Sequence, residues 1–386
     1  MNINRILSVE SDQSAFLFGP RGTGKSTLLH KQFAPKKCLW IDLLKASEEE
    51  RYSHSPDTLI AEVAAMPKNH HHVIIDEIQK IPKLLDVVHL LIEKTDKHFI
   101  LTGSSARKLK KGTANLLAGR AFVYHLAPFT FSELGDHFNL NSALAWGMMP
   151  KIYHFNTDSA KKKYLQSYTH TYLKEEVWNE QLIRQLNPFR HFLEVAAQCN
   201  GKILNFSNIA RDTGVDHKTI QNYYSILEDT LLGFYLPAFH HSFRKQISQS
   251  PKFYMFDVGV NRALARMLSV PVLENNSYYG ELFEQFLIIE IKKQIQYYCD
   301  EYRLSYLCTR DGFEIDLIVQ RPQQSLLLIE IKSSDNVLHH DLKRFIKLAE
   351  EFPDCEAICL SRDPRKKVFE NITVWPWQEG ILHFFK

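Results

Sequence analysis

The stretch of sequence that most constrains the fold is an octapeptide at residues 19–26, which reads Gly-Pro-Arg-Gly-Thr-Gly-Lys-Ser. It follows an apolar segment at 15–18 and precedes a helix-like segment, so we expect it to join a buried strand to a helix. Its glycines allow backbone N–H groups to surround a phosphate without steric clash, and the helix N-terminus adds the positive end of its dipole. The octapeptide therefore predicts a phosphate-binding loop at the edge of a parallel sheet.

Residues suited to binding and hydrolysing ATP with Mg²⁺ surround this loop. We expect Lys25 to contact the β- and γ-phosphates and the Ser26 hydroxyl to bind Mg²⁺. An apolar segment ends in Asp76 and Glu77, which would lie at the carboxyl edge of the sheet, where open parallel sheets bind ligands. Asp76 is predicted to orient the metal through water and Glu77 to polarise the attacking water; the alternative for such a pair is a helix-start acid. The other residues predicted to contact the nucleotide are Gly19, Pro20, Arg21, Gly22, Thr23, Gly24 and Thr27.

Two residues further along the chain complete the predicted nucleotide site. Ser104 follows an apolar segment at 98–101 and is expected beside the γ-phosphate, in the sensing position of an AAA-type arrangement; a hydroxyl that caps the next helix is the alternative. Arg120 is the candidate for an arginine that completes a neighbouring subunit's site, because a planar guanidinium suits the charge that develops on the γ-phosphate. A surface ion pair is the alternative for Arg120. The basic run at 107–111 would neutralise DNA phosphates or, like most charge runs, form a solvated face.

Short apolar runs between residues 15 and 126 alternate with helix-like segments, which is the pattern of a parallel sheet wrapped by helices. Because the runs are polar only at their ends, we expect strands that are buried on both faces. The sequence becomes aromatic-rich and helical after Pro128, so we place the end of the first domain at residue 135. The five predicted strands are 15–18, 38–43, 72–75, 98–101 and 121–126.

A helix-turn-helix pattern marks the second predicted domain, residues 136–270. Residues 207–227 indicate two short helices around a Thr-Gly turn, with Ser207 and Asp216 as the helix-start residues. Apolar runs at 233–236 and 252–256 would add a pair of strands. Together these elements predict a helical domain that contains a winged helix.

The third predicted domain, residues 271–386, has a long helix at 281–296, strands near 303–308, 313–319 and 326–331, and then another helix and strand. This order favours helices that flank a mixed sheet.

Charged side chains on the last two of these strands form a second candidate site. Alternation places Asp316 on the same face of its strand as Glu314, and Lys332 on the same face as Glu330. If residue 316 pairs with residue 330, the acids would hold Mg²⁺ while the lysine positions water for phosphodiester cleavage. This set resembles the Asp…Glu-x-Lys core of restriction-endonuclease-like nucleases, in which the preceding helix often contributes another acid, here Glu284. Cross-strand ion pairs on a solvated face are the alternative.

Composition argues against several other classes of protein. No stretch approaches the roughly 18 consecutive apolar residues of a membrane span, and the N-terminus lacks a signal-peptide core, so we expect a cytoplasmic protein with no membrane contact. The six cysteines are scattered without a Cys-x-x-Cys pair, which suggests neither a zinc site nor a disulfide framework. The net charge of +3 neither demands nor excludes a nucleic-acid partner.

The order of these motifs resembles a prokaryotic family in which an AAA-type ATPase is followed by the domain of unknown function numbered 4143, and the resemblance covers nearly the whole chain. It implies an α/β fold made of a P-loop NTPase (AAA-type) parallel sheet domain, a helical and winged-helix middle, and a restriction-endonuclease-like α/β C-terminal domain. It also implies homo-oligomers, with a ring of six as the family-level expectation, in which one subunit's arginine faces another's nucleotide. The segments that carry the resemblance are 19–26, 74–79, 101–105, 117–120, 126–133, 172–173, 252–259, 280–284 and 330–332.

Two functions from different classes are consistent with the sequence. In the first, ATP hydrolysis drives the remodelling or translocation of duplex or branched DNA, with metal-dependent nuclease activity in the C-terminal domain. In the second, the protein is a nucleotide-controlled switch or assembly protein with protein partners and an inert nuclease-like domain. ATP hydrolysis that is stimulated by DNA and loses that stimulation at high salt would favour the first.

Overall fold

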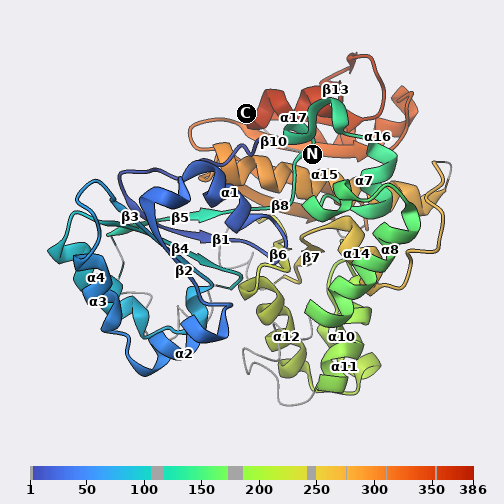
Figure 1. The fold of residues 1–386 in the computed structure, drawn as a ribbon. Helices are drawn as coiled ribbons and strands as arrows, with labels where there is room; N and C mark the ends of the chain where they lie inside the picture. The colour runs from blue at the N-terminus through green and yellow to red at the C-terminus, as the bar shows by residue number, and fades with distance from the viewer. Residues whose placement is uncertain are drawn as a thin grey trace.

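The computed structural model describes residues 3–105, 117, 119–172, 186–240, 249–274, 276–309, 311–352 and 354–386. Figure 1 shows a parallel sheet near the N-terminus (blue to teal), a helical part (green to yellow) and a second sheet near the C-terminus (orange to red). The long helix α15 (Ser277–Tyr298) packs against the second sheet. No described helix is both long and apolar enough to span a lipid bilayer.

The first sheet contains five parallel strands in the order β2-β3-β4-β1-β5. All five predicted strands are confirmed, with ends that differ by at most two residues. The three inner strands are buried at almost every position because helices cover the sheet. The expectation of burial on both faces is wrong for the edge strands β2 and β5, which are partly exposed because each has a neighbouring strand on one side only. The elements are β1 (Ser14–Phe18), α1 (Lys25–Gln32), η1 (Pro35–Lys37), β2 (Cys38–Asp42), α2 (Ala46–His54), α3 (Thr58–Ala64), β3 (His72–Asp76), η2 (Ile78–Lys80), α4 (Leu84–Lys94), β4 (His98–Gly103) and β5 (Ala121–His125).

The middle part is helical and contains the predicted helix-turn-helix and wing. Helices α11 (Phe206–Thr213) and α12 (His217–Asp229) pack on each other, and the antiparallel hairpin of β6 (Gly233–Leu236) and β7 (Lys252–Met255) follows them. The turn between the helices places Gly214 at a φ of 70°, a conformation that favours glycine. The other elements are α6 (Phe131–Leu134), η4 (Gly135–His137), α7 (Leu140–Trp146), η5 (Pro150–His154), α8 (Asp158–Ser167), η6 (Tyr168–Tyr172), α10 (Leu186–Gln198) and α14 (Val258–Leu264).

One of the two predicted helix caps in this motif is wrong. Asp216 caps α12 as expected, its carboxylate accepting the N–H of Thr219 at 3.0 Å. Helix α11, however, begins after Asn205, whose side chain accepts the N–H of Asn208 at 3.0 Å, so Ser207 lies inside the first turn. Asn and Ser are both good cap residues, and two of them so close together left the start of the helix ambiguous.

The second sheet contains six strands in the order β12-β13-β11-β10-β9-β8. It is mixed, as predicted, because β10 runs parallel to β11 and antiparallel to β9. The remaining elements are β8 (Arg303–Cys308), β9 (Glu314–Gln320), β10 (Leu326–Lys332), α16 (His339–Ala349), β11 (Cys355–Ser361), β12 (Lys367–Phe369), β13 (Ile372–Pro376) and α17 (Trp377–Phe385). Helices α15 and α17 pack on one face of this sheet, and α16 packs on the other.

A buried ion pair on α15 fastens the chain that leaves β5 to the C-terminal part. Lys293 donates to Glu290 at 2.7 Å and to the carbonyl of Phe129 at 2.9 Å, while Glu290 also accepts the N–H of Phe131 at 2.9 Å. Both charged side chains are nearly inaccessible to solvent. Since the phosphate-binding loop packs against residue 126, this connection fixes the first sheet relative to α15.

Candidate functional site

The phosphate-binding loop has the backbone that its glycines predict. Gly22 and Gly24 have φ values of 81° and 95°, and Gly24 is the residue that precedes α1. A Cβ atom on Gly19 would lie 2.4 Å from the carbonyl oxygen of Leu126, so no larger residue fits beside the end of β5. These positions need glycine for conformation or for close approach.

The Lys25 side chain folds back over the phosphate-binding loop. Its Nζ donates to the carbonyl of Gly19 at 2.7 Å and lies 3.4 Å from that of Pro20, and the residue is only 6% exposed. Thr23 is fully buried and donates its hydroxyl hydrogen to the Pro20 carbonyl at 2.9 Å. The loop carbonyls therefore hold the ammonium at the place where phosphate oxygens would compete for it.

Ser26 and Asp76 meet at the carboxyl edge of the sheet, as predicted. The Ser26 hydroxyl donates to Asp76 Oδ2 at 2.6 Å. The other carboxylate oxygen of Asp76 accepts a short hydrogen bond from Thr102 on β4. A hydroxyl and a carboxylate side by side are the oxygen ligands that Mg²⁺ prefers.

Glu77 is held in an unusual conformation next to Asp76. Its φ of 62° lies in the left-handed region, which is uncommon for a residue other than glycine and clusters at functional sites. Gln79 donates a short hydrogen bond to the Glu77 carboxylate and a second bond of 3.0 Å to Ser104, and the Ser104 hydroxyl lies 3.5 Å from Glu77. Gly103 makes room for this contact, because a Cβ there would lie 2.8 Å from the Gln79 side-chain oxygen. The structure thus brings Glu77 and Ser104 together through a glutamine that the sequence argument missed.

Arg5 holds the loop from the N-terminal segment, a role that nothing in its local sequence predicts. Its guanidinium donates to the carbonyls of Thr23 at 2.8 Å and Ala127 at 2.6 Å. It also pairs with the buried carboxylate of Glu133 at 2.9 Å. Three fixed donors on one planar group link the loop to the chain that follows β5.

Arg120 lies apart from the loop of its own chain. It forms an exposed ion pair with Glu93 on α4, with its Nη2 at 2.7 Å from the carboxylate. This matches the surface alternative within one chain and leaves the intersubunit role as a prediction. The basic run at 107–111 lies outside the described residues.

The second candidate site forms on β9 and β10 in the register that the sequence analysis considered. Leu317 pairs with Ile329, so the next step of the ladder sets residue 316 opposite residue 330. Asp316 accepts the N–H of Ile331 at 2.7 Å, and Lys332 donates to Glu330 at 2.6 Å. The second oxygen of Glu330 is buried and has no hydrogen-bond partner within the described residues.

Lys252 of the wing hairpin joins this group of acids, which the sequence analysis did not foresee. Its Nζ lies 2.8 Å from Glu314 and 3.9 Å from Glu284, the acid contributed by α15. Within the described residues, no three His, Cys, Asp or Glu side chains converge closely enough to hold one metal ion. We call Glu284, Glu314, Asp316 and Glu330 the carboxylate cluster; in this arrangement it forms an ion-pair network with Lys252 and Lys332.

Burial governs the protonation of the carboxylate cluster. Burial, with the nearby charge of Asp316, raises the pKa of Glu284 to about 8 and that of Glu330 to about 8. Burial also raises the pKa of Asp316. Burial lowers the pKa of Lys252, but the charges of Glu284 and Glu314 outweigh it and leave that pKa above its ordinary value. Burial therefore favours the protonated, neutral form of Glu284 and Glu330 near neutral pH, and a cation bound to these acids would have to displace their protons.

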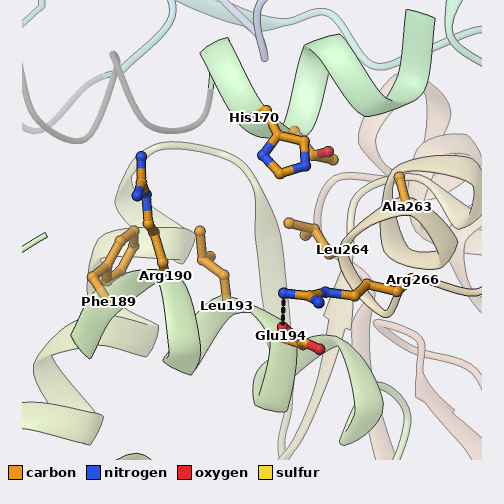
Figure 2. Close-up of a pocket in the computed structure, with 9 residues that line it drawn as sticks. His170, Phe189, Arg190, Leu193, Glu194, Ala263, Leu264 and Arg266 are labelled. Carbon is orange, nitrogen blue, oxygen red and sulfur yellow. Dashed lines mark ion pairs between the residues drawn. The ribbon is translucent and has the colours of Figure 1, made fainter. Parts of the chain in front are cut away.

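A separate cavity of 280 Å³ lies between η6, α10 and α14 (Figure 2). Phe189 and Leu193 from α10 give it an apolar wall, and Arg266 forms an ion pair with Glu194 at 2.9 Å across its lining. Arg190 and His170 are exposed at its edge. No residue predicted for either candidate site lines this cavity.

Comparison with known families places these sites in named domains. Residues 11–135 match the model of an AAA domain, and residues 279–379 match the domain of unknown function DUF4143. The chain therefore carries an AAA domain followed by a DUF4143 domain. Residues 137–270, between them, match a further domain of unknown function, DUF8612. The phosphate-binding loop, Asp76 and Glu77 lie in the AAA domain, and the carboxylate cluster lies in the DUF4143 domain.

Several proteins are similar to this AAA and DUF4143 chain. An uncharacterised protein of Mycobacterium tuberculosis is 26% identical over 309 residues, covering 79% of this chain and 67% of its own length. One of Methanocaldococcus jannaschii is 21% identical over 353 residues, covering 82% and 77%. Among solved structures, the Aeropyrum pernix ORC1 protein in complex with DNA has a TM-score of 0.27 and 11% identity, over 67% of this chain and 87% of that one.

Proposed function

We propose that the protein binds ATP with Mg²⁺ at residues 19–26 and hydrolyses it. The observation that carries this proposal is the contact between Ser26 and Asp76, with the constrained Glu77 beside it. The hydroxyl and the carboxylate fit Mg²⁺, which binds oxygen ligands and keeps several waters. When bound, Mg²⁺ would offset negative charge on the β- and γ-phosphate oxygens.

The chain's own residues would bind the phosphates and activate the attacking water. Backbone N–H groups of the loop bind the phosphates, and Lys25 exchanges the carbonyls of Gly19 and Pro20 for phosphate oxygens. Glu77 accepts a proton from the attacking water as its general base. Gln79 and Ser104 contact the Glu77 side chain, so a γ-phosphate that binds Ser104 would change the position of the Glu77 carboxylate.

The test is Mg²⁺-dependent ATP hydrolysis by the full chain. Lys25→Ala is expected to lower hydrolysis by at least about 10²-fold, the loss that follows removal of one group that stabilises transition-state charge. Lys37→Ala, which removes an exposed lysine from η1, is the matched control and should retain wild-type activity. Equal activity of Lys25→Ala and wild type would refute the proposal.

We also propose that hydrolysis responds to DNA. Helix α12 supports this, because it is the second helix of a helix-turn-helix and its exposed N-terminal half carries Lys218, Gln221 and Asn222. Amide and ammonium groups at these positions suit hydrogen bonding to base edges and phosphates in a major groove. DNA should stimulate ATP hydrolysis at low salt, and Lys218→Ala with Gln221→Ala should weaken the stimulation. Hydrolysis that is unchanged by linear, forked and four-way DNA would favour a nucleotide-controlled switch with protein partners.

A second candidate activity, metal-dependent cleavage of DNA, is favoured by the buried, unpartnered oxygen of Glu330. The carboxylates fit Mg²⁺ or Mn²⁺ in chemistry, and Glu284, Asp316 and Glu330 would hold the ion once their side chains converge. Lys332 would orient water towards the phosphodiester. Cleavage that disappears in Lys332→Ala while ATP hydrolysis survives is the expected result. An uncleaved panel of duplex, single-stranded and branched DNA would argue for an inert domain.

A further inference from the structure

Lys252 brings a positive charge from the wing hairpin into the carboxylate cluster. It is the first residue of β7, yet its side chain is 4% exposed and reaches Glu314 and Glu284 at 2.8 Å and 3.9 Å. The ammonium also lies 5.2 Å from the centre of the Tyr306 ring. A cation therefore already occupies the space between these acids.

The backbone around Lys252 belongs to the middle part on both sides. Lys252 pairs with Leu236 in the hairpin and forms a bridge with Ile203 on its other side. Hydrogen bonds between the backbones of Gly201 and Phe253 at 2.8 Å and of Leu204 and Pro251 at 2.9 Å enclose it. The position of the ammonium is thus set by the wing and the segment before α11, and any movement of the hairpin would move the charge.

The two lysines of the cluster do not pair with every acid. Lys252 pairs with Glu314 and Glu284, and Lys332 pairs with Glu330, but no ion pair to Asp316 is found within the described residues. A second, independent observation is that one oxygen of Glu330 is buried without a hydrogen-bond partner in the part of the chain that the structure describes, since buried carboxylate oxygens are normally satisfied.

We propose that Lys252 is a built-in cation that keeps divalent metal out of the carboxylate cluster until the wing hairpin moves. This proposal rests on the second candidate activity, for which the same acids would hold the metal. The Lys252 ammonium already lies between Glu284 and Glu314, so a divalent ion held by Glu284 would compete with it for the same carboxylate and be repelled by its charge. A cavity of 280 Å³ lined by Lys252, Glu284 and Glu314 opens at the exposed Lys202 and Ile203, and it gives an ion a path to the cluster.

The test measures Mn²⁺ binding to the full chain without nucleotide, and electron paramagnetic resonance detects the bound ion. Lys252→Gln is expected to bind Mn²⁺ at the carboxylate cluster at least about tenfold more tightly than wild type does, so that it holds one more ion at concentrations where the wild-type cluster is empty. Adding Asp316→Asn should abolish the gain. Lys252→Arg, which keeps the charge, and Lys202→Gln, which removes a lysine from the rim of the same cavity, should behave like wild type.

Two results would overturn the proposal in distinguishable ways. If wild type and Lys252→Gln bind the additional Mn²⁺ equally well, and Asp316→Asn removes it from both, the metal site stands but Lys252 does not block it. If neither binds it, the cluster is not a metal site and the nuclease proposal fails too. In case Lys252→Gln does not fold, amine acetylation of wild type provides a second measurement. Mn²⁺ should increase the modification of Lys252 but not that of the exposed Lys202, and unchanged protection of Lys252 at saturating Mn²⁺ would refute the exclusion.

Discussion

Tyr168 donates its hydroxyl hydrogen to the carbonyl of Arg21 at 2.9 Å, so the middle part of the chain is bonded directly to the phosphate-binding loop. Tyr168 is 1% exposed and begins the π-helical turn η6, a rare structure that is frequent at functional sites. Met149 and Tyr164 also lie close to Gly22 of the loop. A change in the loop conformation on binding a triphosphate would therefore alter the packing of Tyr164 in α8 and of Tyr168 in η6.

Tyr168→Phe should tighten ATP binding. The Tyr168 hydrogen bond stabilises the loop in the state where Lys25 contacts the carbonyls of Gly19 and Pro20, and such a bond contributes about 0.5–1.5 kcal/mol. Its loss should lower the Kd for ATP by up to about tenfold, measured by calorimetry with a nonhydrolysable analogue. Tyr235→Phe, which removes a hydroxyl on β6, is the control. Weaker binding by Tyr168→Phe would show that the bond instead prepares the loop for the nucleotide.

Substitutions of Glu77 should abolish hydrolysis, and the glycine variant should do so without loss of thermal stability. Glu77→Gln is expected to bind ATP but to lose hydrolysis by about 10²-fold or more, the usual contribution of a general base. Glu77→Gly should lose hydrolysis as well, yet melt at an equal or higher temperature than Glu77→Gln. The reason is that a left-handed residue other than glycine costs about 1–3 kcal/mol, while glycine costs about 0.5–1 kcal/mol in chain entropy. Full hydrolysis by Glu77→Gln, or a lower melting temperature for Glu77→Gly, would contradict this view.

Local patterns made the first sheet predictable. The phosphate-binding loop, its flanking strand and the Asp76–Glu77 pair depend on residues that are neighbours in sequence, and the structure places them as expected. Even the register of β9 and β10 followed from alternation and one assumed pair.

The residues that the sequence missed act across long separations. Arg5 reaches Glu133, and Lys252 reaches Glu314; nothing in the local sequence of either residue distinguishes it from a surface cation. Gln79 is close in sequence to Glu77, but its role depends on contact with Ser104 from the next strand of the sheet. Such contacts require the tertiary fold, which composition and periodicity do not specify.

Arg120 should act between subunits if it completes a neighbour's nucleotide site. Within its own chain it pairs with Glu93 on the surface, so Arg120→Ala should leave the melting temperature nearly unchanged, because exposed ion pairs contribute about 0–1 kcal/mol. Hydrolysis should nevertheless fall. Mixing Arg120→Ala with Glu77→Gln subunits should restore part of it, since some interfaces would combine an intact Glu77 with an intact Arg120. An absence of rescue in a mixed oligomer would remove Arg120 from the mechanism.

Two adjacent lysines on α15 should respond oppositely to loss of charge. Lys293 pairs with the fully buried Glu290, and removing one partner of a buried pair leaves an uncompensated charge. Lys293→Met is therefore expected to destabilise the protein by about 3–5 kcal/mol. Lys292 is half-buried, and burial lowers its pKa; its ammonium lies 5.8 Å from the centre of the Phe234 ring but forms no hydrogen bond or ion pair within the described residues.

Lys292→Met is accordingly the matched control, with the same chemical change one residue away, and it should be neutral or stabilising because it removes the desolvation cost of an ammonium. Urea unfolding monitored by fluorescence, with separate transitions fitted where they occur, measures both variants. Because the Lys293 pair holds residues 129–131 to α15, its loss should also expose the end of β5 to hydrogen exchange, whereas Lys292→Met should leave that exchange unchanged. Equal destabilisation by the two substitutions would mean that volume in α15, and not the ion pair, fastens the AAA domain to the C-terminal part.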